Sequence, residues 1–219
     1  MLDFSNSKIL IVGDVMLDKY YFGKVDRISP EAPVPIVNIQ KEESRLGGAS
    51  NVANNIVSLG GHSLLCGVIG HDLFGKEIER ISRHKNIDTF LLKTSSPTIT
   101  KARIIGGKQQ IVRVDYEDKS ELNADNKKLF RDTISRILPE YDILVISDYG
   151  KGLISEDLCR YLIKLAHKYD KKVIIDPKGK NWEKYSGADI VTPNVKELSD
   201  IVGYTVPNTD RAIEKAARE

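Results

Sequence analysis

Acidic and amide side chains follow the apolar runs of this sequence at regular places. Each of five short aliphatic runs is followed, within three residues, by an aspartate or an asparagine. These residues are Asp14, Asp72, Asp148, Asp176 and Asn194. In an open α/β sheet, ligands bind outside the carboxyl ends of the strands. Turns also favour Asp and Asn, whose side chains bond to nearby backbone, and this explains any single position as well. The set as a whole favours a polar binding cleft along one edge of a sheet.

The stretch RLGGASNVANNIVSLGG (45–61) is a second candidate site. A P-loop needs GxxxxGK followed by Ser or Thr, and a dinucleotide fingerprint needs GxGxxG directly after the first strand. Here Gly47 and Gly48 are adjacent and come about 35 residues after the first apolar run, so neither phosphate loop fits. What remains is a glycine turn before a helix, where backbone amides and Asn51 could bind a sugar hydroxyl. A plain turn with a solvated asparagine face explains these residues equally well.

The elements that must position these residues follow from the hydrophobic pattern. Five runs are apolar on successive residues, as in strands buried on both faces: 9–12, 64–69, 143–146, 173–175 and 190–191. Between them, segments such as 49–60 and 158–166 repeat apolar residues at helical spacing, and Ser155 is a predicted N-cap. This alternation predicts an α/β fold with a mostly parallel sheet covered by helices on both faces.

Three segments do not fit the parallel core: 34–40, 98–105 and 109–116. The last two alternate polar and apolar residues around a glycine reversal, as half-exposed antiparallel strands do. We predict a small separate antiparallel sheet, with strands within 20–41 and 98–116, that acts as a lid or an interface. Pairing of such exposed strands between two copies would also describe a non-catalytic, dimerising protein.

The composition excludes several classes of function. The 219 residues carry a formal net charge of +2, and the lysines are spread along the chain, so we expect neither nucleic acid nor membrane as a partner. Cys66 and Cys159 lie in apolar patterns without metal-ligand spacing. Buried free thiols fit a reducing cytoplasm, which is the expected location.

Several motifs together resemble the pfkB, or ribokinase-like, family of carbohydrate kinases. They are GDVMLD (13–18), GGASNVANN (47–55), SDYGKG (147–152), DPKG (176–179) and TPNVKEL (192–198). Further segments, RISPEAPVP, PTITKARI and QQIVRVDYE, are similar to kinases that phosphorylate D-glycero-D-manno-heptose 7-phosphate at C1. In many bacteria such a kinase is one half of a bifunctional ADP-heptose synthesis protein.

The resemblance implies a ribokinase-like fold with a β-sheet lid and a role in ADP-heptose and lipopolysaccharide core biosynthesis. The reaction it implies is transfer of the ATP γ-phosphoryl group, with Mg²⁺, to the anomeric hydroxyl of heptose 7-phosphate, giving the 1,7-bisphosphate. By this resemblance the substrate-binding residues are Asp14, Asp18, Gly47, Gly48, Asn51 and Asp148. It places Lys178 near the phosphates, and Asn194 and Glu197 at Mg²⁺ and phosphate, through water.

The 7-phosphate of such an acceptor needs cations. The candidates are Lys101, Arg103, Arg113 and Lys151. Strands that face water also often carry Lys and Arg, which is the alternative explanation of these residues.

The family's catalytic base lies in a Gly-Ala-Gly-Asp motif, which these 219 residues do not contain. No catalytic residue is therefore assigned. We expect residues 1–219 to be a single incomplete kinase domain without its C-terminal third, with little activity alone and with dimerisation through the lid. Another pfkB-family kinase of a different sugar or sugar phosphate is the alternative.

Overall fold

A computed structural model describes residues 3–218 and contains a six-stranded, fully parallel sheet of order β10-β9-β8-β1-β4-β5. Its strands are β1 (Lys8–Gly13), β4 (His62–Gly70), β5 (Asp88–Thr94), β8 (Ile143–Ser147), β9 (Lys172–Asp176) and β10 (Ile190–Val191). The chain adds strands on one side of β1 and then on the other, so the sheet is doubly wound as predicted. The switch point lies between β1 and β8, where ligands of such sheets bind. Strand β5, at the sheet edge, was not predicted.

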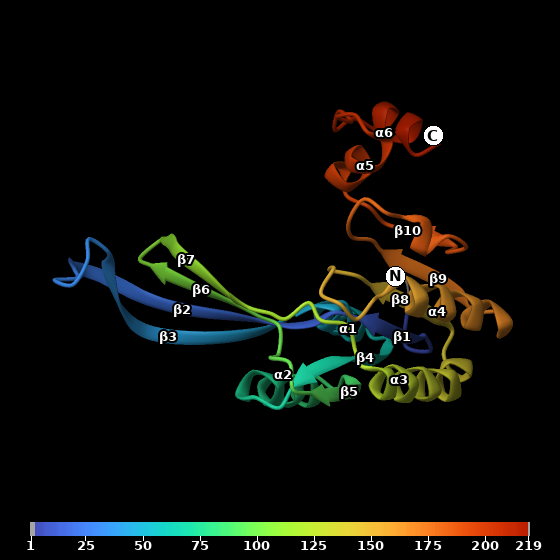
Figure 1. Ribbon diagram of the computed structural model, residues 1–219, viewed down its shortest axis with the longest axis horizontal. Coiled ribbons are helices and arrows are strands. Elements are labelled where there is room, and N and C mark those ends of the chain that lie inside the picture. The colour runs from blue at the N-terminus through green and yellow to red at the C-terminus, as the bar shows by residue number, and fades with distance from the viewer. Residues whose placement is uncertain (1–2, 219) are drawn as a thin grey trace.

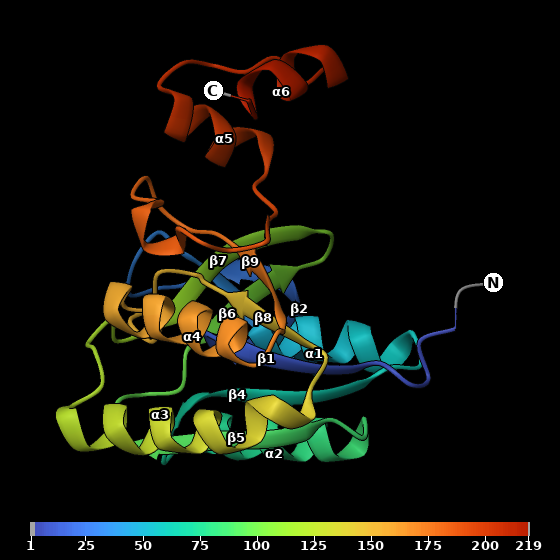
Figure 2. The ribbon, with the colours of Figure 1, turned by 90° about the vertical axis from the view of Figure 1, so that its right-hand side faces the viewer.

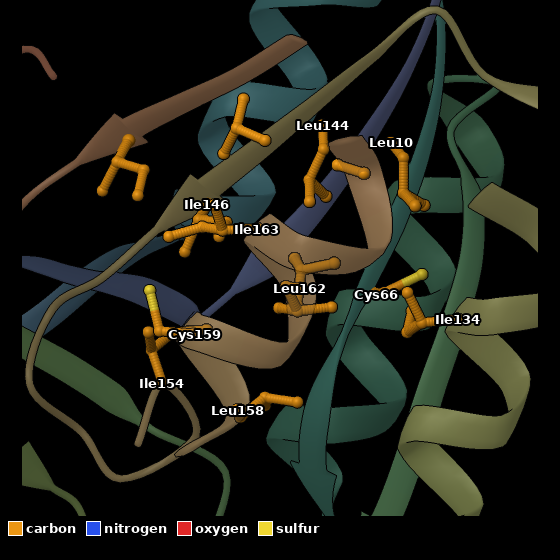
Figure 3. Close-up of a cluster of buried hydrophobic side chains, with 14 of the residues drawn as sticks. Leu10, Cys66, Ile134, Leu144, Ile146, Ile154, Leu158, Cys159, Leu162 and Ile163 are labelled. Carbon is orange, nitrogen blue, oxygen red and sulfur yellow. The ribbon is translucent and has the colours of Figure 1, made fainter. Parts of the chain in front are cut away.

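Helices cover both faces of this sheet. They are α1 (Ala49–Ser58) and α2 (Leu73–His84) on one face, and α3 (Ala124–Ile137) and α4 (Glu156–Lys168) on the other (Figure 2). Each face has its own buried cluster, one built around Ile11 and Ile78 and the other around Leu144 and Phe130. The second cluster includes both cysteines, which are free and buried (Figure 3). Burial raises the pKa of the Cys159 thiol to about 12, so it stays protonated at neutral pH.

Four long strands form a separate sheet that projects from this α/β body (Figure 1). They are β2 (Val15–Ile28), β3 (Pro35–Gly48), β6 (Thr100–Gly106) and β7 (Gln109–Tyr116), in the order β3-β2-β6-β7. We call this sheet the lid. The prediction of an antiparallel lid was wrong for its central pair, because β2 and β6 both leave the body in the same direction and therefore pair in parallel. The outer pairs are antiparallel, so the sheet is mixed.

The helices α5 (Val195–Val202) and α6 (Asp210–Ala216) follow β10 and pack against each other away from the body (Figure 1). Their small apolar cluster includes Leu198, Val206 and Ala216. Two short 3-10 helices, η1 (Leu138–Glu140) and η2 (Glu183–Tyr185), complete the elements of the described chain. Within residues 3–218, none of the helices has the length and apolar character needed to cross a membrane.

Candidate functional site

A cleft lies where the lid meets the body, between β2, β3 and β6 of the lid and the start of α1. We call it the lid cleft. Six of the predicted substrate-binding residues line it: Asp18, Gly47, Gly48, Asn51, Lys101 and Arg103. Tyr149, from the segment that follows β8, closes its inner end. The lid cleft has a volume of about 690 Å³, within the range of small-molecule sites.

Strand register places several charged residues on one face of the lid. Asp18 of β2 lies opposite Arg45 of β3 and opposite Lys101 of β6, and Lys101 lies opposite Asp115 of β7. Residues directly opposite each other in neighbouring strands point to the same face of a sheet. These four side chains therefore form one transverse row on the cleft face of the lid.

A second row lies two residues further along the strands, on the same face. It contains Tyr20, Arg103 and Arg113, again directly opposite one another. The Tyr20 ring lies between two guanidinium groups, with Arg45 4.9 Å and Arg103 5.2 Å from its centroid. Cations at such distances are attracted to the face of an aromatic ring. The cleft face of the lid thus holds four cations, two of them against the Tyr20 ring. It also holds Glu43, which lies opposite Tyr20 and accepts a hydrogen bond from Arg45 at 2.7 Å.

The carboxylates of the same face pair with these cations. Arg103 Nη1 donates to Asp18 Oδ1 at 2.6 Å. Arg113 Nε donates to Asp115 at 2.8 Å, and the Lys101 ammonium lies 3.4 Å from the same carboxylate. The hydrogen bond from Arg113 and the charge of Lys101 hold the pKa of Asp115 below its ordinary value. An anionic ligand would therefore compete with these carboxylates for the cations.

The start of α1 forms the body side of the lid cleft. Gly48 is the N-cap, with φ +54°, and none of the described residues caps this helix with a side chain. A Cβ at Gly48 would lie 2.4 Å from the carbonyl oxygen of Asp14, and one at Gly47 would lie 2.6 Å from Oδ2 of Asp18. Position 48 therefore requires glycine, whereas a side chain at position 47 would displace the Asp18 carboxylate, which lies directly against the backbone. The first of its amides, that of Ala49, donates to the Asp14 carbonyl oxygen at 3.0 Å, whereas the next first-turn N–H groups have no side-chain cap and could donate to a ligand.

Asp14 lies beside this turn but outside the lid cleft. Its Oδ2 accepts hydrogen bonds from the backbone amides of Tyr149, at 2.8 Å, and Lys151, at 3.1 Å. Burial raises the pKa of Asp14 to about 6, and the charge of Asp148 acts in the same direction. Lys151 forms an ion pair with Glu117, and with Asp14 it lines a different cavity. The structure therefore separates these two predicted substrate-binding residues from the six that line the lid cleft.

Asp148 also holds the segment after β8. Its carboxylate is buried and accepts hydrogen bonds from the Gly150 amide at 2.7 Å, the Tyr185 hydroxyl at 2.7 Å and the Lys184 ammonium. It therefore has little capacity left for a ligand.

Asp72, another acid at a strand end, is the N-cap of α2 and accepts a hydrogen bond from the Gly75 amide, as turn-forming aspartates do.

A second polar group lies at the ends of β9 and β10. Lys178 Nζ donates to Glu197 Oε1 at 2.8 Å. Asn194 and Glu197 form a capping box at the start of α5, each side chain accepting from the other residue's amide. Burial and the charge of Glu197 raise the pKa of Asp176 at the end of β9. The structure thus brings together all three predicted nucleotide-side residues, with Asp176 beside them.

Tyr149 connects the two groups. It lines the lid cleft, and burial raises the pKa of its phenol. The charges of Asp176 and Asp18 act in the same direction, which places the phenol in the field of both groups. A ligand in the lid cleft would therefore lie next to whatever binds at Lys178.

The metal-binding capacity of this region is limited to indirect contacts. Within residues 3–218, no three His, Cys, Asp or Glu side chains converge as a metal site. The oxygens of Asn194 and Glu197 already accept hydrogen bonds. Mg²⁺ keeps several waters in such sites, so Asp176 and Glu197 fit a hydrated ion held through its waters.

Comparison with known proteins identifies the family. Residues 6–219 match the profile of the pfkB family carbohydrate kinases. The chain belongs to the pfkB family of carbohydrate kinases. Its doubly wound sheet with a separate lid is the ribokinase-like fold, as its motifs predicted.

The chain is similar to curated relatives over most of its length. It is 48% identical over 193 residues to "Bifunctional protein HldE" of Helicobacter pylori strain P12, covering 87% of this chain and 42% of that protein. It is 43% identical over 215 residues to "D-beta-D-heptose 7-phosphate kinase" of Bordetella bronchiseptica, covering 98% of this chain and 67% of that one. The chain thus spans about two-fifths of the bifunctional relatives that it matches.

The fold is similar to solved structures of more distant kinases. The tetrameric inhibited form of phosphofructokinase-2 from Escherichia coli superposes with a TM-score of 0.73 at 20% identity. The match covers 97% of this chain and 68% of that one. This likeness supports the fold assignment, including the lid.

Arg45, Lys85 and Tyr149 are among the lid-cleft residues that were not predicted. Tyr20, whose ring lies against Arg45 on the lid, was not predicted either. A signal existed for Arg45, which stands two residues before Gly47 and so shares its face in an extended strand. The prediction missed it because it ended that strand near residue 41, whereas β3 continues to Gly48.

Proposed function

We propose that the lid cleft is the acceptor site of a kinase for D-glycero-D-manno-heptose 7-phosphate, which phosphorylates the C1 hydroxyl to give the 1,7-bisphosphate. The observation that carries the proposal is the cationic cleft face of the lid, opposite a glycine turn and an uncapped helix. The relative at 43% identity is named a D-beta-D-heptose 7-phosphate kinase, which supports the same acceptor. Such a product belongs to the route to ADP-heptose and the lipopolysaccharide core.

The two ends of the acceptor have different requirements. Its hydroxyls need groups that donate and accept, which Asp18, Asn51 and the first-turn amides of α1 beyond Ala49 supply. Its phosphate needs cations, and Arg guanidinium groups suit it because they bind phosphate with two parallel hydrogen bonds. We place the phosphate against Arg103 and Lys101, with Arg45 and Arg113 nearby. This orientation directs the anomeric end toward Tyr149 and the Lys178 group.

On the nucleotide side, we propose that Lys178 lies along the ATP phosphates and that Asp176, Asn194 and Glu197 hold hydrated Mg²⁺. When bound, Mg²⁺ neutralises charge on the transferred phosphoryl group. Phosphoryl transfer depends mainly on positioning and on charge neutralisation. The described residues can supply both.

No base for the acceptor hydroxyl is assigned, because the sequence contains no Gly-Ala-Gly-Asp motif. General base catalysis contributes about 10²–10⁴-fold, and the helix amides of that motif would add charge stabilisation. We therefore expect these 219 residues, tested alone with ATP, Mg²⁺ and heptose 7-phosphate, to turn over very slowly. Rapid turnover would contradict this assignment of roles.

A second proposal concerns assembly. The lid face opposite the cleft carries exposed apolar side chains, among them Val112 and Val114 of β7 and Ile39 of β3. We propose that two copies pair through this face, because it offers apolar surface beside unpaired strand edges.

The acceptor can be tested by ligand-induced shifts of the melting temperature. Heptose 7-phosphate should stabilise the chain more than fructose 6-phosphate or ribose does, since binding to the folded state raises its stability. Equal shifts of the melting temperature with all three compounds would contradict the assignment of heptose 7-phosphate as the acceptor. A larger shift with ribose would favour a different pfkB-family kinase.

A further inference from the structure

A second cavity, separate from the lid cleft, lies at the carboxyl edge of the parallel sheet. It has a volume of about 370 Å³ and is bounded by the ends of β4 and β5, the segment 117–123 and the first turn of α3. We call it the edge cavity. The described residues that line it include none that line the lid cleft. Its volume is sufficient for a ligand the size of a monosaccharide.

Two buried polar atoms at the edge cavity have no hydrogen-bond partner among the described residues. One is Oδ1 of Asp14, a residue that is only 1% exposed and whose Oδ2 already accepts two backbone hydrogen bonds. The other is Oγ1 of Thr94 at the end of β5. Buried polar atoms in folded proteins almost always have a partner. Both residues also line the edge cavity, so its wall contains polar groups whose hydrogen-bonding capacity is not used within the described chain.

The charges around the cavity exclude an anionic ligand. Asp14, Asp118 and Glu121 line it, whereas its one lysine, Lys151, is already paired with Glu117. A phosphate or carboxylate would face three acids without a free cation, and repulsion between like charges opposes such binding.

The same charges do not call for a cationic ligand. Asp118 accepts hydrogen bonds from the hydroxyls of Ser96 and Ser120, and Glu121 pairs with Lys127. Glu121 is therefore paired with a cation, and Asp118 already has two hydroxyl donors, so neither carboxylate is without a partner.

The remaining lining matches an uncharged polyol. Ser95 and Asn126 present hydroxyl and amide groups, which both donate and accept, while Val68 and Ile69 form an apolar wall. A sugar has the same combination of hydroxyl edges and an apolar C–H face. We propose that the edge cavity is a second ligand site that binds a neutral polyhydroxylated molecule of monosaccharide size. This proposal does not depend on the proposed kinase acceptor.

The test is saturation-transfer NMR on the 219-residue chain, with myo-inositol, D-glucose and D-mannose as neutral probes. Spermidine and inorganic phosphate serve as charged probes. At least one neutral sugar should bind. Asn126→Phe, which fills the cavity from α3, should weaken that binding at least about tenfold. Lys128→Phe, on the exposed side of the same turn, and Asn51→Ala, in the lid cleft, should leave it within about twofold.

Three results would overturn the proposal: no neutral probe binds, spermidine or phosphate binds in their place, or Asn51→Ala removes the binding while Asn126→Phe does not. Circular dichroism and thermal melting check that each variant is folded. If Asn126→Phe unfolds, Ser95→Trp fills the same cavity from an exposed loop and must give the same loss.

Discussion

Asp14 shows how a single residue combines a structural and a chemical role. The sequence places it at a strand end, which suggested direct substrate contact. In the structure, one carboxylate oxygen of Asp14 accepts hydrogen bonds from two backbone amides of the segment after β8. Sequence patterns could identify the residue but not its partners, because those come from positions more than 130 residues away.

The raised pKa of Asp14 predicts a pH-dependent stability. Its folded-state pKa of about 6 exceeds the ordinary value near 3.8. Between these pH values the folded chain keeps a proton that the unfolded chain releases, so stability falls as pH rises. The free energy of unfolding of wild type, relative to Asp14→Asn, should decrease by on the order of 3 kcal/mol from pH 4 to pH 7. Urea unfolding at several pH values measures this.

Asp189 provides the control. Hydrogen bonds from Lys172, the Val173 amide and His167 hold its pKa below the ordinary value. Its contribution is therefore present above about pH 4 and is lost only at lower pH. Asp189→Asn should show nearly constant stability relative to wild type between pH 4 and pH 7. Parallel curves for the two variants would contradict the assignment of the effect to Asp14.

Gly48 gives the second prediction at this scale. Alanine there meets both a positive φ and a collision with the Asp14 carbonyl oxygen. Gly48→Ala should lower the free energy of unfolding by about 3 kcal/mol or more. Gly60→Ala is the matched control: its φ is +92° but no described atom lies within 4 Å of the new Cβ. It should cost only about 1 kcal/mol. Equal losses in denaturant melts would show that the close approach at Gly48 is unimportant.

Individual elements were predicted well where their pattern is local. The five core strands and the helices at 49–60 and 158–166 follow from apolar periodicity. Ser155 caps α4, as predicted, and accepts a hydrogen bond from the Leu158 amide. The lid strands were misjudged because β2 and β3 carry polar residues and bulges along much of their length, so the hydrophobic pattern does not mark their bounds. The parallel pairing of β2 with β6 depends on chain direction in space, which the pattern does not contain.

The capping box of α5 permits a prediction about an element. Asn194→Ala removes the N-cap hydrogen bond and should cost about 1 kcal/mol of helix stability. It should also weaken binding of ATP with Mg²⁺, because Glu197 loses its partner beside Lys178. Asn123→Ala removes the equivalent N-cap of α3 at a similar cost. Fluorescence titration with a labelled nucleotide should show weaker binding for the first variant alone. Equal nucleotide binding by the two variants would show that the start of α5 is not part of the nucleotide site.

At the scale of the whole molecule, the motifs predicted the family and the comparisons confirm it. Composition and periodicity alone led only to an α/β fold with a polar cleft. The cationic face of the lid arises from register across β3, β2, β6 and β7, which joins residues from 18 to 115. Such register could not be read from the spacing of the residues along the chain.

The lid also determines the expected assembly. Val112→Asp combined with Val114→Asp places charge on the apolar lid face and should convert a dimer to a monomer in sedimentation experiments. Leu73→Asp changes a still more exposed apolar residue on α2 and should leave the dimer intact. A monomeric wild type, or dissociation by both variants alike, would contradict assembly through the lid.

The central claim is that the lid cleft binds a sugar phosphate through its cations. Isothermal titration calorimetry of heptose 7-phosphate and of unphosphorylated heptose, carried out in the Asn126→Phe background, tests it most directly. We predict that the phosphorylated sugar binds at least about tenfold more tightly, and that Arg103→Met removes most of this difference while Lys128→Met does not. Equal affinities for the two sugars, or an unchanged preference in Arg103→Met, would contradict the claim.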